Sequence, residues 1–153
     1  MRVVARPPAK GFRKSADSTG MFEWKTEYSV HINSIDEQHK NLFAIAHELH
    51  TAMCSGQAKQ ALGKILDRLV QYTATHFAYE EKLMQQCGYP DLAAHKKEHQ
   101  ALTQQVVDFQ QKFHAGTATM SVQLMTFLKS WLEHHIKGSD TRYSALLIEK
   151  KVA

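Results

Sequence analysis

Apolar residues recur in alternating steps of three and four along four stretches of this chain. That spacing places them on one face of an α-helix, the face that packs inside a helical bundle. Ser34-Ile35-Asp36-Glu37 has the form of a capping box, so the first helix is expected to begin just after Ser34 and to end before Gly56. The first three long helices are predicted to span about residues 35–55, 57–86 and 90–114, and the fourth carries its stripe from Ser121 to His135.

Short connections separate these helices. Residues 88–91 (Gly-Tyr-Pro-Asp) mark a turn between the second and third helices, and Thr117 or Thr119 is expected to cap the fourth. After Gly138, a last short helix is predicted over about 140–149. Short loops favour antiparallel neighbours, so the order of the helices indicates an up-down-up-down bundle.

Residues 21–33 lack helical spacing and are predicted to form an irregular arm. Its aromatic residues Trp24 and Tyr28 are expected to pack over the end of the bundle. The predicted fold class is therefore all-α: an up-down-up-down four-helix bundle with an N-terminal irregular arm and a short C-terminal helix.

Composition adds limits on function. The chain has 153 residues, 43% of them hydrophobic and 22% charged, which suits one domain with a buried core. No stretch approaches the roughly 20 apolar residues of a membrane span. The net charge of +4 comes from residues 1–20, with five basic residues and one acidic residue, so nucleic-acid binding is not indicated. We expect residues 1–20 to be a disordered basic extension and residues 21–153 to form the domain.

The two cysteines, Cys54 and Cys87, fall at opposite ends of the predicted bundle. They are too far apart for a disulfide and are expected to be free thiols. Nothing here requires an oxidising compartment, so the expected location is the cytoplasm.

The second helix carries the first sign of chemistry. His76 and Glu80 stand four residues apart on its apolar stripe, so both are expected to point inward. A buried, unpaired glutamate is costly. No Lys or Arg falls on this stripe, so a metal ion is the leading partner for Glu80.

The other inward-facing polar residues converge on the same place. They lie near the start of the first and third helices and near the end of the second and fourth, which meet at one end of an up-down-up-down bundle. These residues are His39, His76, Glu80, His95, His99 and His135.

Asp140 adds a second carboxylate, but it follows His135 by five residues. On an ideal helix this spacing turns the two side chains about 140° apart. Both can point inward only if the backbone departs from α geometry, and Gly138 lies between them, so we predict a π-bulge or break there.

Five imidazoles and two carboxylates exceed what one tetrahedral zinc ion can use. A pair of metal ions bridged by both carboxylates uses all seven, and mostly nitrogen donors suit iron, copper or zinc. The chain contains no Glu-x-x-His, so the carboxylate-rich ferritin-like class is disfavoured.

The complete spaced set resembles the hemerythrin pattern, and most closely that of the single-domain bacterial hemerythrins. The supporting stretches are Ile35-Asp36-Glu37-Gln38-His39, His76-Phe77-x-x-Glu80-Glu81 and Trp131-Leu132-x-x-His135-Ile136. The resemblance covers about residues 21–149 and implies a non-haem centre of two iron ions, Fe2+/Fe3+, with an oxo or hydroxo bridge.

By this resemblance, the centre binds dioxygen reversibly and the protein is a carrier, not an enzyme. One iron would be held by His95, His99 and His135 and the other by His39 and His76, with Glu80 and Asp140 bridging both. Phe77, Trp131, Leu132 and Ile136 match the apolar lining of the oxygen pocket. A monomer is expected. The sequence does not identify an oxygen-consuming partner protein.

Two alternatives use the same scaffold: a di-iron enzyme (oxidase, peroxidase or nitric-oxide handling) and an oxygen or redox sensor. Glu81 is expected to be solvated, Asp36 to favour the helix N-terminus, and Tyr143 to pack against either the site or only the bundle end. The other histidines are expected off the site: His31, His47, His50, His114 and His134.

Overall fold

The apolar faces of four long helices meet in one core. The computed structural model describes residues 21–151, and the predicted basic extension, residues 1–20, lies outside them. In chain order the elements are a 3-10 turn η2 (Thr26–Tyr28), α1 (Asn33–Cys54), α2 (Lys59–Cys87), α3 (Leu92–Ala115), α4 (Val122–His134), a π-helical turn η3 (His135–Asp140) and α5 (Thr141–Lys150).

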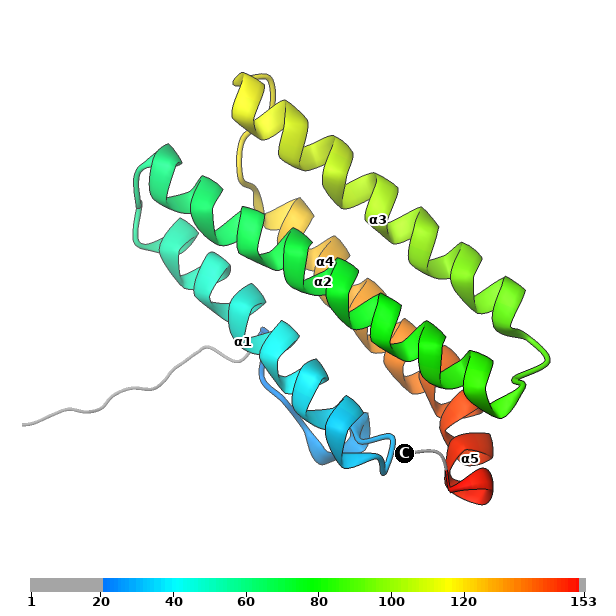
Figure 1. The fold of residues 1–153 in the computed structure, drawn as a ribbon. Coiled ribbons are helices and arrows are strands. Elements are labelled where there is room, and N and C mark those ends of the chain that lie inside the picture. The colour runs from blue at the N-terminus through cyan, green and yellow to red at the C-terminus, as the bar shows by residue number, and fades with distance from the viewer. Residues whose placement is uncertain (1–20, 152–153) are drawn as a thin grey trace, which may run out of the picture.

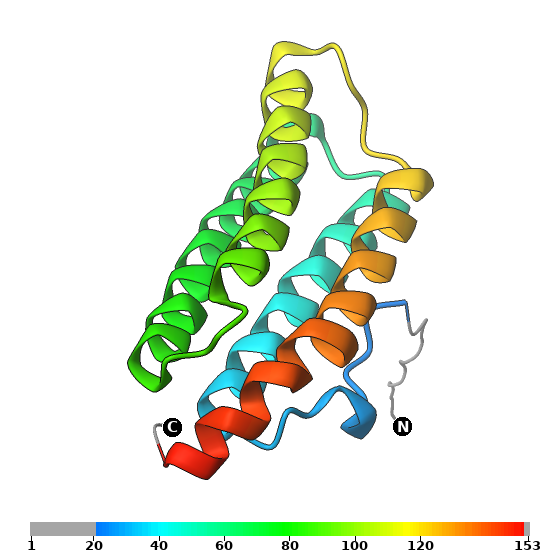
Figure 2. The same cartoon turned by 90° about the vertical axis from the view of Figure 1, so that its right-hand side faces the viewer.

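The long helices lie side by side and alternate in direction, as the sequence predicted (Figures 1 and 2). The start of α1, the end of α2, the start of α3 and the α4–η3 junction meet at one end of the bundle (Figure 1). We call this the site end, and the opposite end the far end. The short helix α5 continues from η3 at the site end (Figure 1).

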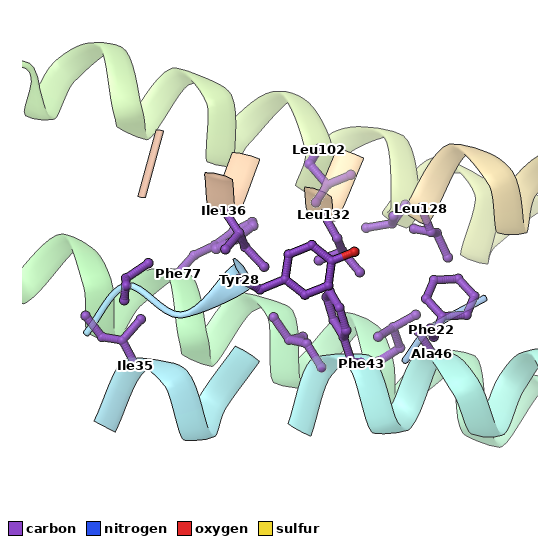
Figure 3. Close-up of a cluster of buried hydrophobic side chains, with 14 of the residues drawn as sticks. Phe22, Tyr28, Ile35, Phe43, Ala46, Phe77, Leu102, Leu128, Leu132 and Ile136 are labelled. Carbon is purple, nitrogen blue, oxygen red and sulfur yellow. The ribbon is translucent and has the colours of Figure 1, made fainter. Parts of the chain in front are cut away.

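The N-terminal arm packs along the side of the bundle rather than over its end. Tyr28 is buried, and its ring meets Phe43 of α1 edge-on at 5.1 Å between ring centroids. Its hydroxyl donates a 2.6 Å hydrogen bond to Glu133 of α4. Figure 3 shows Phe22 and Tyr28 of the arm in the same apolar cluster as Phe43. The arm therefore closes the seam between α1 and α4.

The predicted capping box at Ser34 is wrong. Helix α1 begins at Asn33, with Ile32 before it and no side-chain cap. The hydroxyl of Ser34 instead accepts a 2.9 Å hydrogen bond from Tyr79 of α2. Asp36 accepts hydrogen bonds from the arm, including one of 2.8 Å from the backbone N–H of Val30, and so ties the arm to α1.

The fourth helix also starts later than predicted. Ser121 is its N-cap, and its side chain accepts from the backbone N–H of Leu124 at 3.2 Å, so neither Thr117 nor Thr119 has the predicted role. Gly88 and Gly116 end α2 and α3 in the left-handed conformation, as expected for glycine stops.

The predicted distortion near Gly138 is confirmed, because His135–Asp140 forms one π-helical turn. The wider turn brings both end residues to the inside, where His135 is 4% exposed and Asp140 is fully buried. Within residues 21–151, no helix is both long and apolar enough to cross a membrane. Cys54 is exposed, Cys87 is buried, and both are free thiols.

Candidate metal centre

The structure brings all seven predicted ligand residues together at the site end. Each is at most 4% exposed. They form two sets of imidazoles with two carboxylates between them. The three-histidine set is His95, His99 and His135, and the two-histidine set is His39 and His76.

Glu80 faces both sets. Its Oε2 lies 3.3 Å from Nε2 of His39 and 3.2 Å from Nε2 of His76. Its other oxygen, Oε1, lies 3.2 Å from Nε2 of His99. The two oxygens of this carboxylate are therefore divided between the two sets.

Asp140 divides its oxygens in the same way. Oδ2 lies 3.1 Å from Nε2 of His39, and Oδ1 lies 3.1 Å from Nε2 of both His95 and His135. Two carboxylates that each span both sets are the arrangement that bridges a pair of metal ions.

Several polar atoms at the centre of this cluster make no hydrogen bond of acceptable geometry within the part of the chain that the structure describes, although imidazole nitrogens lie close to them. They include three carboxylate oxygens and one imidazole nitrogen: Glu80 Oε1, Asp140 Oδ1 and Oδ2, and His95 Nε2. Buried polar atoms without partners are costly, and buried charges in proteins are paired or coordinate metals. The donor set therefore fits a pair of cations better than a purely hydrogen-bonded core.

The pKa values of the buried groups in the metal-free chain also favour a cation at this site. Burial raises the pKa of Glu80, but the imidazoles of His76 and His39 outweigh it and hold that pKa well below its ordinary value. Burial lowers the pKa of His39, yet the carboxylates of Asp140 and Glu80 raise it to about 9. A proton on His39 balances part of the carboxylate charge, and a metal ion bound there would displace it.

Other side chains orient the candidate ligands. Nδ1 of His76 lies 2.6 Å from Oε1 of Gln38, and Nδ1 of His99 lies 2.8 Å from Oε2 of Glu81. The expectation that Glu81 is solvated is therefore wrong, because its carboxylate accepts the ring N–H of a candidate ligand on α3. Gln38 was not among the predicted site residues, although its position next to His39 at the site end was a usable signal.

Tyr143 belongs to the site, which resolves the alternative left open by the sequence. It is fully buried, and its hydroxyl donates a 2.5 Å hydrogen bond to Oε2 of Glu80. It follows Asp140 by three residues, so the two share a helix face.

The predicted oxygen-pocket residues lie on the bundle side of the cluster. Phe77 stacks on His99 with 3.7 Å between ring centroids, and Trp131 stacks on His135 at 4.4 Å. Both rings, with Leu132, line a small apolar cavity of about 20 Å³ that continues toward the bundle core. The fourth residue, Ile136, is 1% exposed and is not part of the cavity lining.

The remaining histidines lie outside the cluster, as predicted. Four are exposed and one, His50, is half-buried; the exposed ones are His31, His47, His114 and His134.

The fold and the donor set define a class: four-helix bundles with a buried histidine and carboxylate site suited to two metal ions. A model of the family described as hemerythrin HHE cation binding domain matches residues 30–147, and the chain belongs to this hemerythrin family.

Curated relatives and solved structures agree with this assignment. Bacteriohemerythrins of Stenotrophomonas maltophilia and Methylococcus capsulatus are each 39% identical over 121 residues. These matches cover 79% of this chain and 78% and 92% of the two relatives, respectively. A crystal structure of wild-type hemerythrin is 38% identical and superposes with a TM-score of 0.78, covering 82% of this chain and 96% of the other.

Proposed function

We propose that the seven residues of the cluster hold two iron ions and that the resulting centre binds dioxygen reversibly. One ion would lie against the three-histidine set and the other against the two-histidine set, with Glu80 and Asp140 bridging both. One observation carries this proposal: each carboxylate directs one oxygen toward each set of imidazoles. The family assignment and the mostly nitrogen donors favour iron.

When bound, the iron pair would supply the electrons for reversible dioxygen binding, with the oxo or hydroxo bridge that the family resemblance implies. The chain's own residues hold the ligands in place and keep water away. Phe77 and Trp131 cover His99 and His135 by stacking. The hydroxyl of Tyr143 holds its proton against Oε2 of Glu80, which fixes the orientation of that carboxylate.

The lining of the cavity favours a carrier over an enzyme. Of the eleven residues around it, Thr73 alone carries a polar side-chain group apart from the indole of Trp131, and neither is an acid or base. The Thr73 hydroxyl donates to the backbone oxygen of Leu69 at 2.7 Å. An oxidase or peroxidase would need a group that delivers protons beside the reacting position. We therefore propose a carrier, in which residues 21–153 act as one domain and dioxygen is the ligand.

The proposal is tested with the full chain loaded anaerobically with ferrous iron. Exposure to oxygen and then to argon should produce and remove the same visible absorption over several cycles, with about two irons per chain. One irreversible spectral change, with consumption of peroxide or reductant, would favour the enzyme or sensor alternatives. Zinc bound in preference to iron would contradict the assignment of the cofactor.

A further inference from the structure

The two metal positions differ in the charge of the side chains that contact the outer ring nitrogens (Nδ1) of their histidines, which we describe as lying behind the ligands. Behind the three-histidine set, Nδ1 of His99 lies 2.8 Å from the carboxylate of Glu81. Glu98 also faces this set, with Oε1 at 3.5 Å from Nδ1 of His135. Behind the two-histidine set, the partner of His76 is the neutral amide of Gln38 at 2.6 Å.

A hydrogen bond from the outer nitrogen of an imidazole to a carboxylate makes the inner nitrogen a stronger donor than a bond to a neutral oxygen does. The side chain of Glu81 is 26% exposed, so solvent screens its charge only partly. The side chain of Glu98 is 42% exposed and also accepts hydrogen bonds from Ser139 at 2.6 and 2.9 Å. Glu81 should therefore have the larger effect of the two carboxylates.

The bridging carboxylate adds to this difference. Oε2 of Glu80, the oxygen on the side of the two-histidine set, accepts the hydrogen bond from Tyr143. The other oxygen of the same carboxylate, Oε1, lies on the side of His99 and makes no hydrogen bond within residues 21–151. A donated proton withdraws electron density from Oε2, so the same carboxylate is the weaker donor toward the two-histidine position.

We propose that Glu81 and Gln38 are positioning residues that set how strongly the two positions hold metal, with Glu81 strengthening the three-histidine position and Gln38 leaving the other weaker. This inference rests on the ligand assignment of the proposed function but not on dioxygen binding. The two positions should differ in metal affinity because of the charge behind their ligands, in addition to the effect of three histidines against two.

Two substitutions between Glu and Gln, which differ in charge but hardly in shape, separate the effect of this charge from the effect of the number of histidines. Glu81→Gln keeps an oxygen that can accept from His99 but removes the charge, and Gln38→Glu adds a charge behind His76 while keeping the acceptor. The metal-free full chain is titrated with Co2+ against a chromophoric chelator to obtain both stepwise affinities. Glu48→Gln is the control for net charge: Glu48 is exposed near the end of α1 at the far end, and its carboxylate makes only a surface ion pair, with Arg68 at 2.9 Å.

We expect Glu81→Gln to weaken the tighter step about 10- to 100-fold and to leave the second step nearly unchanged. Gln38→Glu should strengthen the second step and leave the first unchanged. Glu48→Gln should alter neither, and all three metal-free variants should unfold at the wild-type temperature.

Affinities of Glu81→Gln and Gln38→Glu within twofold of wild type at both steps would overturn the inference. So would equal weakening of both steps together with a lower unfolding temperature of the metal-free chain, because that pattern indicates a structural role. A wild-type chain that binds no pair of ions would instead overturn the proposed function and, with it, this inference.

Discussion

The two ends of the bundle have different cores. At the far end, the helices bury apolar side chains such as Leu49, Leu66, Phe113 and Met125. At the site end, α1, α2, α3 and the π-helical turn η3 bury five imidazoles and two carboxylates. Apolar burial stabilises the fold without any ligand, whereas buried charges contribute only when paired. The far end therefore stabilises the fold with or without metal, whereas the seven polar side chains at the site end need partners to offset the cost of their burial.

The largest expected effect removes one bridge. Glu80→Ala or Asp140→Ala deletes a carboxylate whose oxygens reach both sets of imidazoles, so neither variant should hold a full pair of ions. Iron analysis of purified protein should give fewer than two irons per chain. Full iron content together with reversible dioxygen binding in both variants would show that the ligand assignment is wrong.

A substitution in the apolar core of the far end should lower the stability of the fold without lowering the iron content. Leu66 is 2% exposed, and Leu66→Ala should lower the free energy of unfolding by about 2–5 kcal/mol through lost burial and a cavity. Chemical denaturation should show this loss in both the metal-free and the metal-loaded chain. The iron content per chain should stay at the wild-type value, and a parallel loss of iron would mean that the two ends are coupled.

The site end of the metal-free chain should respond to pH. The pKa of His39 is raised from its ordinary value of 6.5 to about 9, so the stability that its proton contributes is present below pH 6.5 and lost as the pH rises through about 9. The free energy of unfolding of the metal-free chain should fall over this interval. His39→Gln should make this fall less steep, because it removes one of the imidazoles whose pKa the buried carboxylates raise. An equally steep fall in His39→Gln would contradict the assignment.

The smallest effect concerns a helix cap. Ser121→Ala removes the oxygen that accepts from the backbone N–H of Leu124, which should cost about 1 kcal/mol. Thermal unfolding should detect the loss, and the metal affinity should not change. Thr119→Ala is the matched control and should cost less, because Ser121 and not Thr119 is the N-cap.

The fold was largely predictable because its signals are local. The steps of three and four specified the four helices, and the five-residue step from His135 to Asp140 specified the π-helical turn. The convergence of the ligand residues followed from alternating helix directions. The location of Gln38 and Glu81 behind the ligands did not follow, because those contacts join α1 to α2 and α2 to α3.

The errors have the same physical origin. Ser34 matched a capping box, but its hydroxyl instead accepts a hydrogen bond from Tyr79 of another helix. Glu81 was expected in solvent because it is adjacent to the buried Glu80 in sequence, yet it reaches a ring nitrogen of His99. A polar side chain at the edge of a helix face takes the nearest partner in three dimensions, and sequence spacing along one helix does not identify that partner.

The most direct test of the central claim locates the metal ions themselves. Crystals of the chain loaded anaerobically with ferrous iron would be measured at the iron absorption edge. We expect two anomalous peaks at the site end, one beside the three-histidine set and one beside the two-histidine set, each contacting both Glu80 and Asp140. A single peak, or two peaks of which one does not contact both carboxylates, would contradict it.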